Sequence, residues 1–304
     1  MPDSPLPPAD LDLRLLRCFA VVAEHRHFGR AAETLHTTQP SLSRQIRRLE
    51  RQVGARLFDR GRQGSRLTAA GEAFLPLANE LLRAAARAAA TARAAARPSR
   101  ITIGHTRGLY ITPAVRALRH RDPDADVRTL NVDWNEPHKA LLDHRVDAVV
   151  ARLPFPTDGL RVTVLYDEPR YLVVSRDHRL AGKESVTLDD IADEPVPRVR
   201  QSPPVWGAFW RIDPRPDGRP VPDGPLVETV EDKFEVIAAG EAVGILPSRH
   251  ATQHPDLTTI ALEGVEPCQV ALATRAGDRN RLVAAFREHA RAHLTGTVEP
   301  RPGD

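Results

Sequence analysis

Cysteine is scarce in this sequence, which has two cysteines among 304 residues, Cys18 and Cys268. Two cysteines 250 positions apart form neither a disulfide framework nor a metal-ligand spacing, as expected in a reducing compartment. The first ten residues lack the basic and apolar regions of a secretory signal. The least polar stretch, 83–97, contains four arginines and is too short to span a bilayer. We therefore expect a cytoplasmic protein with no membrane partner.

Catalytic and metal-binding patterns are missing as well. No spacing of Ser, His and Asp suggests a nucleophile with its base, and Gly240 and Gly244 fit turns better than a phosphate-binding loop. His289 and His293 are four residues apart, but Glu288 precedes the pair, so the pattern is not the HExxH metal motif. The sequence therefore predicts no catalytic residue, no metal, no cofactor and no enzyme activity.

Charge is distributed unevenly along the chain, although the net charge is only +3. Residues 11–67 contain twelve arginines and five acidic residues, a net +7, whereas residues 98–304 carry a net −4. A basic N-terminal part joined to an acidic body indicates a head that binds a polyanion. The length is typical of two or three domains.

Three short helices are predicted within the basic part. Apolar residues at helical spacing predict helices over 11–25, 29–35 and 39–53, the arrangement of a helix-turn-helix. The third has an apolar face of Leu42, Ile46, Leu49 and Val53, opposite Pro40, Arg44, Arg47, Arg48 and Arg51. Thr38 is a suitable N-cap for this helix, and Pro40 suits its first turn. Taken alone, the basic face fits either a solvated surface or a DNA-binding surface.

A small hairpin and a long helix are predicted next. The pairs Leu57-Phe58 and Arg66-Leu67 flank a glycine-containing polar turn at 61–64, which predicts a hairpin. Thr68 can cap a helix over 69–97, in which Pro76 predicts a kink or loosened turn. Two apolar seams at heptad spacing fit either a dimer contact or a rigid alanine-rich spacer. The first seam is Phe74, Leu77, Leu81, Ala84, Ala88, Thr91 and Ala95; the second is Leu75, Ala78, Leu82, Ala85, Ala89, Ala92 and Ala96.

From residue 98 onwards, strand and helix patterns alternate, which is typical of an α/β domain with a mainly parallel sheet. Strands are expected at 100–105, 126–131, 146–153, 162–175 and 270–275, and helices at 112–120, 137–144 and 280–294. Residues 234–247 predict a helix, a glycine turn and a buried strand, whereas the proline-rich segment 198–225 predicts mainly loop.

Residues 16–71 closely resemble the DNA-binding domain of LysR-type transcriptional regulators. His27 departs from the family pattern, in which serine is common, and this puts the cap of the second helix in doubt. The segments PDADV, VDAVVARLP, LVVSRDHRLA and AAGEAVGILP resemble the family's effector-binding domain more weakly. The matching positions of the first domain are Phe19, Val22, Glu24, Phe28, Ala31, Ala32, Leu35, Gln39, Pro40, Ser41, Ser43, Gln45, Ile46, Leu49, Glu50, Gly54, Leu57, Phe58, Arg60, Leu67, Thr68 and Gly71.

The resemblance implies an α/β protein with an N-terminal winged helix-turn-helix (11–68), a linker and dimerisation helix (69–97) and an effector-binding domain (98–294). That last domain resembles a periplasmic binding protein, with lobe I at 98–165 and 268–294 and lobe II at 166–267. The implied function is sequence-specific transcriptional regulation, modulated by a small-molecule effector between the lobes. The implied partners are double-stranded DNA with an interrupted palindromic operator and a second copy in a dimer or tetramer, with RNA polymerase left open.

The basic face and the resemblance together assign roles to individual positions. Base contacts are expected from Gln39, Pro40, Ser43 and Arg44, and contacts to the DNA backbone from Thr38, Gln45, Arg47, Arg48, Arg51 and Arg60. Effector contacts are expected from Thr106, Arg107, Trp134, Asn135, Arg198, Gln201, Ser202 and Pro247. The two arginines favour an anionic effector such as a carboxylate, with structural roles for either arginine and packing for Trp134 left open.

Two other classes of function can be weighed from the residues. A solute-binding receptor would need a signal peptide and no basic helical head, and the sequence has the reverse. An α/β enzyme with an accessory DNA-binding domain would need a catalytic constellation, and none is visible. Turnover of candidate metabolites, as opposed to stabilisation by them, separates these classes from a ligand-responsive regulator.

Overall fold

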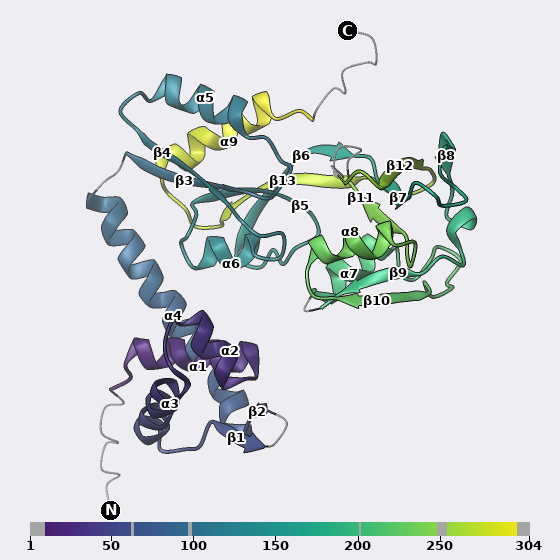
Figure 1. Ribbon diagram of the computed structural model, residues 1–304. Helices are drawn as coiled ribbons and strands as arrows, with labels where there is room; N and C mark the ends of the chain where they lie inside the picture. Colours follow the sequence, from purple (N-terminus) through teal and green to yellow (C-terminus); the bar gives the residue numbers. More distant parts are fainter. Residues whose placement is uncertain (1–9, 62–63, 97–98, 201, 248–253, 297–304) are drawn as a thin grey trace, which may run out of the picture. The chain divides into compact units, whose positions relative to one another are not determined.

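The computed structural model describes residues 10–61, 64–96, 99–200, 202–247 and 254–296. The chain folds into two compact units that divide between Arg93 and Ala94. The first unit is helical with a small hairpin, and the second is built of sheets and helices (Figure 1). The expected fold class, a winged helix-turn-helix with a two-lobed α/β body, is confirmed.

The first unit is a three-helix core followed by a hairpin and a long helix. Its elements are α1 (Leu13–His25), α2 (Phe28–Thr34), α3 (Gln39–Val53), β1 (Phe58–Gly61), β2 (Gly64–Leu67) and α4 (Ala69–Ala96). The antiparallel strands β1 and β2 pair Phe58 with Leu67 and form the wing. The ring of Phe19 lies 5.3 Å from the rings of both Phe58 and Phe74. Helix α1, the wing and α4 therefore share one core.

Side-chain caps fix where the helices of the helix-turn-helix begin. The hydroxyl of Thr38 accepts a hydrogen bond from the N–H of Ser41 at 3.4 Å, as the sequence predicts for α3. At α2 the cap is His27, whose Nδ1 accepts from the N–H groups of Gly29 at 3.1 Å and Arg30 at 3.3 Å. The imidazole nitrogen supplies the acceptor that a serine hydroxyl would supply, so α2 is capped despite the departure from the family pattern.

Helix α4 begins at a threonine cap and continues through a proline. The hydroxyl of Thr68 accepts from the N–H of Gly71 at 3.0 Å, and the helix runs unbroken past Pro76. The seam that contains Ala78 packs into the core of the first unit. On the other seam, Leu77 is 56% exposed and Leu81 is 43% exposed. Across the part of the chain that the structure describes, no helix has the length and apolar character to cross a membrane.

The first sheet of the second unit has the strand order β4-β3-β5-β13-β6. Strands β3, β4 and β5 pair in parallel, whereas β13 is antiparallel to β5 and β6. Helices α5 and α9 cover one face of the sheet and α6 covers the other (Figure 1). The elements are β3 (Arg100–His105), α5 (Thr112–Arg121), β4 (Asp126–Asn131), α6 (Pro137–Leu142), β5 (Ala148–Arg152), β6 (Leu160–Glu168), β13 (Cys268–Arg275) and α9 (Arg281–His293).

The second lobe contains a four-stranded sheet of order β11-β7-β12-β8 and a parallel pair, β9 with β10. Its strands are β7 (Tyr171–Ser175), β8 (Ser185–Val186), β9 (Val196–Val199), β10 (Asp223–Val227), β11 (Gly244–Leu246) and β12 (Leu257–Leu262). Its helices are the short 3-10 helix η1 (Asp189–Ile191), α7 (Pro204–Arg211) and α8 (Val230–Ala238). Trp210 of α7 and Val243 before β11 are buried in the largest core of this lobe.

Three details of the second unit differ from the sequence-based expectation. Residues 162–175 form two strands in different sheets, because Pro169 and Arg170 interrupt the run after Glu168. The sheets are mixed and not mainly parallel. The segment 198–225 contains α7, which starts with a proline in its first turn, where a missing N–H costs little.

Candidate nucleic-acid interface and inter-lobe cluster

Helix α3 has one buried apolar face and one exposed basic face. The buried residues are Leu42, Ile46 and Leu49, and the exposed arginines are Arg44, Arg47, Arg48 and Arg51. The helix ends at Gly54, whose φ of 77° lies in the left-handed region that glycine adopts without strain. The predicted division of this helix into a core face and a basic face is confirmed.

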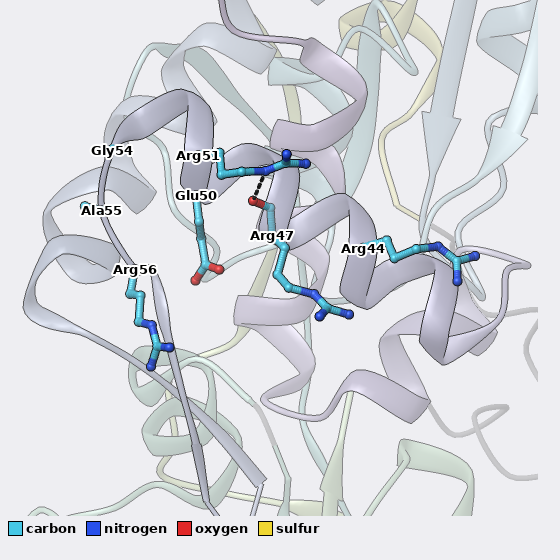
Figure 2. A pocket seen from close by; sticks show the side chains of 7 residues that line it. All are labelled: Arg44, Arg47, Glu50, Arg51, Gly54, Ala55 and Arg56. Atoms are coloured by element: carbon cyan, nitrogen blue, oxygen red, sulfur yellow. Dashed lines mark hydrogen bonds between the residues drawn. The ribbon is translucent and has the colours of Figure 1, made fainter.

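The arginines of α3 differ in their intramolecular contacts. Arg47 Nε donates to the carbonyl of Ser43 at 3.3 Å, and Arg51 Nε donates to the carbonyl of Arg47 at 3.4 Å, so these side chains bond to their own helix. Arg44 projects away from the other labelled side chains in Figure 2. Among the described residues, the side chains of Arg44 and Arg48 have no hydrogen-bond or ion-pair partner. Their guanidinium groups are free to bind an external ligand.

A shallow surface hollow of about 820 Å³ lies beside the second half of α3. Four arginines and one glutamate supply the charge of its lining: Arg44, Arg47, Glu50, Arg51 and Arg56, with Gly54 and Ala55 between them (Figure 2). Glu50 Oε1 accepts from the N–H of Leu57 at 2.9 Å and of Phe58 at 3.4 Å. Its carboxylate therefore ties α3 to the first wing strand, and the arginines dominate the charge of the hollow.

The other predicted DNA contacts lie mostly at the start of α3. The exposed ones are Thr38, Gln39 and Pro40. Ser43 is only 8% exposed. Gln45 Oε1 accepts from the thiol of Cys18 at 3.0 Å, which links α3 to α1. The side chain of Arg60 lies outside the described part of the structure, and the DNA roles of all these residues stay predictions.

In the second unit, side chains from the two lobes meet in what we call the inter-lobe cluster, formed by Arg107, Trp134, Trp206 and Glu231. Trp134 follows β4 and Trp206 lies on α7, and their ring centroids are 4.0 Å apart. Arg107, which follows β3, has its Nη1 3.0 Å from Oε1 of Glu231 in the first turn of α8. Both contacts join residues more than 70 positions apart in the sequence.

The loop after β3 is supported by a nearly buried ion pair. Arg152 Nε lies 2.7 Å from Oε2 of Glu168, and these side chains are 15% and 14% exposed. Arg152 Nη1 also donates to the carbonyl of Arg107 at 3.0 Å, which fixes the backbone that presents the Arg107 side chain. Of the other predicted effector residues in this lobe, Thr106 is buried and Asn135 is exposed.

None of the described effector residues predicted in lobe II joins the inter-lobe cluster. Arg198 Nη1 lies 3.2 Å from Oδ2 of Asp223, so its partner is on the adjacent strand β10. The hydroxyl of Ser202 donates to a backbone carbonyl three residues earlier, at 2.9 Å. Pro247 is partly buried after β11. Gln201 lies outside the described residues.

Sequence reasoning missed three residues of these sites. Arg56 lies in the loop after α3, beyond the helical pattern that marks the other arginines. Trp206 lies in a proline-rich segment that the sequence predicts as loop, and Glu231 is an ordinary first-turn acid of α8. The scarcity of tryptophan, with three in the chain, was the available signal for Trp206. The described residues contain no group of His, Cys, Asp and Glu that could hold a metal ion.

A winged helix-turn-helix with an exposed basic helix face, in one chain with a two-lobed α/β unit, defines the class of DNA-binding regulators with a ligand-binding domain. Comparison with family models identifies the family. The bacterial regulatory helix-turn-helix protein model of the lysR family matches residues 13–72, and the LysR substrate binding domain model matches residues 92–295. The chain belongs to the LysR family of transcriptional regulators.

Known relatives match over most of the chain. The chain is 28% identical to the HTH-type transcriptional regulator AlsR of Bacillus subtilis (strain 168), over 96% of this chain and 100% of AlsR. It is 33% identical to the small neutral protease regulatory protein of Streptomyces coelicolor, over 84% of this chain and 77% of that protein. Full-length BenM matches at 26% identity and a TM-score of 0.52, over 93% of this chain and 96% of BenM. Full-length CbnR complexed with its target DNA matches at 27% identity and a TM-score of 0.50, over 93% and 99%.

Family membership establishes the general function. The protein is a DNA-binding transcriptional regulator with an effector-binding domain, and it is not an enzyme. The two other classes weighed from the sequence, a solute-binding receptor and an enzyme with an accessory DNA-binding domain, are set aside by this result.

Proposed function

We propose that α3 is the recognition helix and that Arg44 is its main base-contacting residue. Two observations carry this proposal: Arg44 is exposed without an intramolecular partner, and it lies nearer than Arg48 to the start of α3, the end of a recognition helix that contacts base edges. Such a guanidinium can bind a guanine edge bidentately. The base-contacting set would be Gln39, Pro40, Ser43 and Arg44. The backbone-contacting set would be Thr38, Gln45, Arg47, Arg48, Arg51 and Arg60, with Arg56 added from the lining of the hollow.

Two arginines on this helix provide a matched test. The operator is first located by DNase footprinting on the DNA beside the protein's own gene. Arg44→Ala is expected to reduce the discrimination between operator and unrelated duplex by about 1–3 kcal/mol, the cost of one lost bidentate base contact. Arg48→Ala is expected to weaken binding to both duplexes by a similar factor. It is also expected to lower the slope of log affinity against log salt concentration by about 0.9, the loss of one phosphate contact. If Arg44→Ala reduced the affinity for the operator and for the unrelated duplex equally, Arg44 would not contact bases.

We also propose self-association through the exposed seam of α4. Leu77 and Leu81 would be buried by a second copy, and apolar residues at heptad spacing favour a helix–helix contact. A two-fold dimer explains an operator that is an interrupted palindrome. Leu81→Ser is expected to shift the sedimentation of the protein toward monomer, while Arg87→Ser, on neither seam, is expected to leave it unchanged. A dimer that persists unchanged in Leu81→Ser would place the contact elsewhere.

The domain limits belong to the same proposal. Residues 11–68 would form the DNA-binding domain, 69–97 the dimerisation helix and 98–294 the effector-binding domain. Lobe I would comprise 98–165 and 268–294, and lobe II 166–267. Strand β6 runs across the 165/166 limit, with Glu168 still paired to Cys268. A cytoplasmic location follows from the DNA target.

We further propose that the effector binds at the inter-lobe cluster and carries an anionic group that pairs with Arg107. The side chains of Arg107 and Glu231 are 82% and 59% exposed, so their ion pair is weak and replaceable. A carboxylate on the effector could form two parallel hydrogen bonds with the guanidinium. The tryptophan pair beside it offers an aromatic surface for the rest of the molecule.

Tryptophan fluorescence can test the effector site directly. The only tryptophans of the chain are Trp134, Trp206 and Trp210, and successive ring centroids are 4.0 Å and 6.2 Å apart. A panel of carboxylate metabolites is titrated while emission is followed. Arg107→Ala is expected to weaken binding of the active compound by about tenfold or more, whereas Arg198→Ala should have little effect. If Arg198→Ala weakened binding and Arg107→Ala did not, the anionic group would bind at Arg198.

A further inference from the structure

Lobe II contains a second pocket, of about 430 Å³. Its lining comes from three segments: the residues around η1, the loop before β10 and the turn after β12. No residue of the inter-lobe cluster and no residue of α3 lines it. The pocket is therefore separate from both sites of the proposed function.

Arg215 lines this pocket and is only 5% exposed. Its Nη2 lies 3.4 Å from the carbonyl oxygen of Ile191, which is a long hydrogen bond. Its Nε and Nη1 are buried and have no hydrogen-bond partner among the described residues. Buried donors are nearly always paired in folded proteins, since an unpaired one costs stability. Two of the three nitrogens of the Arg215 guanidinium, Nε and Nη1, therefore lack an acceptor among the described residues.

The neighbouring protein groups do not supply that acceptor. Burial lowers the pKa of Arg215, and the charge of Asp213 offsets only part of this effect. The carboxylate of Asp213 is already engaged, with Arg211 Nη1 at 3.4 Å and the N–H of Val221 at 3.3 Å. The backbone around Arg215 is fixed as well, because its N–H donates to the carbonyl of Arg219 at 2.9 Å.

Acidic side chains surround the exposed part of the pocket. They are Asp189, Asp193, Asp217 and Glu263. Arg219 Nε lies 2.5 Å from Asp217 Oδ2, and its Nη2 lies 3.7 Å from Asp189 Oδ1, so two of the carboxylates have a partner. The side chains of Asp193 and Glu263 form no hydrogen bond or ion pair within the described ranges, and the charge of Arg219 reaches Asp193 only at longer range. The pocket thus combines a buried group that needs an acceptor with exposed groups that would accept a cation.

We propose that this pocket binds a zwitterion of the free amino acid class, with its carboxylate on Arg215 and its ammonium group at Asp193 and Glu263. A simple dianion would meet four carboxylates against two arginines, and a simple cation would leave Arg215 unpaired. A molecule with both a carboxylate and an ammonium group would pair with Arg215 through the first and with the acidic side chains through the second. The apolar walls formed by Leu188, Pro216, Pro220 and Pro222 would contact the amino acid side chain.

Calorimetric titration of the full-length protein with the twenty standard L-amino acids tests the proposal. For the amino acid that binds best, its N-acetyl form removes the ammonium group and its amide removes the carboxylate. Each derivative is expected to bind at least about tenfold more weakly, the loss of one charge-assisted contact. Arg215→Met and the double change Asp193→Asn with Glu263→Gln are expected to weaken binding similarly. Trp134→Phe, in the inter-lobe cluster, is the matched control and should leave binding unchanged.

Several results would overturn the proposal. No heat of binding for any of the twenty amino acids at millimolar concentration would mean that water alone occupies the pocket. Binding that is lost in Trp134→Phe and kept in the pocket variants would assign the amino acid to the inter-lobe cluster. If Arg215→Met fails to fold, the exposed pair Asp193→Asn with Glu263→Gln and the N-acetyl form still decide the question. DNA binding is measured separately, so failure here leaves the role of Arg44 untouched.

Discussion

Replacing Lys233 with methionine is expected to stabilise the second unit at neutral pH. Lys233 lies on α8 and is 5% exposed. A Cβ on Gly244 would lie 3.2 Å from its Cε and 3.7 Å from its Nζ, so the lysine side chain packs against β11. Burial lowers the pKa of Lys233 to about 8, and no carboxylate of the described residues forms an ion pair with it. Methionine keeps most of the apolar side chain and removes the buried charge.

The size and the pH dependence of this effect follow from the shifted pKa. An unfolded lysine has a pKa near 10.4. Below pH 8 the lysine is charged in both states, and the folded state carries the full cost of burying it, roughly 3 kcal/mol for a pKa lowered from about 10.4 to about 8. Between pH 8 and about 10.4 the folded state loses the proton first, so this cost falls as pH rises. Subtracting about 1 kcal/mol for the small void left by methionine predicts a net gain of about 2 kcal/mol at pH 7.

Urea unfolding followed by tryptophan fluorescence measures this gain, because all three tryptophans lie in the same unit as Lys233. The advantage of Lys233→Met over the unchanged protein is expected to shrink between pH 8 and 10.4. Lys183→Met is the control: that side chain is 48% exposed and paired with Asp190, so its loss should change the free energy of unfolding by under about 1 kcal/mol. A Lys233→Met protein that is less stable at pH 7, by an amount that stays constant to pH 10, would refute the reasoning.

Three further outcomes are expected. Gly71→Ala should destabilise the first unit by about 1–3 kcal/mol, because the added Cβ overlaps the carbonyl oxygen of Leu57. Thermal unfolding followed by circular dichroism measures this loss, and an unchanged melting temperature would contradict it. His27→Ala should cost about 1 kcal/mol by the same measurement and His27→Ser should cost less, since only alanine removes the cap of α2. Burial raises the pKa of the Cys268 thiol to about 12, so this cysteine should react with the thiol reagent DTNB at pH 8 only after unfolding; rapid reaction of the folded protein would count against its burial.

The sequence alone was sufficient to predict the elements whose limits are set by local signals such as caps and apolar periodicity. The limits of α3 were predicted to the residue, because Thr38 caps it, Pro40 occupies its first turn and Gly54 ends it in a left-handed conformation. The same kind of signal, periodic apolar residues with a cap, placed α1, α4 and α9 within a few residues. The division of α3 into buried and basic faces needed only the helical period.

Tertiary partners decided the features that the sequence did not predict. Whether residues 162–175 form one strand or two depends on which neighbours pair with each half, and these neighbours are β13 for β6 and β11 with β12 for β7. The partners of Arg107 and Trp134 lie on helices of the other lobe, at Glu231 and Trp206. No sequence spacing specifies such contacts, and a proline-rich composition concealed the helix that carries Trp206.

The histidine cap of α2 also constrains how this part of the sequence can vary. A Cβ at position 29 would lie 3.0 Å from Cε1 and 3.2 Å from Nδ1 of His27, closer than side chains normally approach. Histidine at position 27 and glycine at position 29 are therefore expected to occur together among relatives, whereas serine at position 27 leaves position 29 free to carry a side chain. In an evolutionary path from serine to histidine, a side chain at position 29 would force the imidazole ring to shift by a few tenths of an ångström, so a glycine already present there makes the histidine cap easier to acquire.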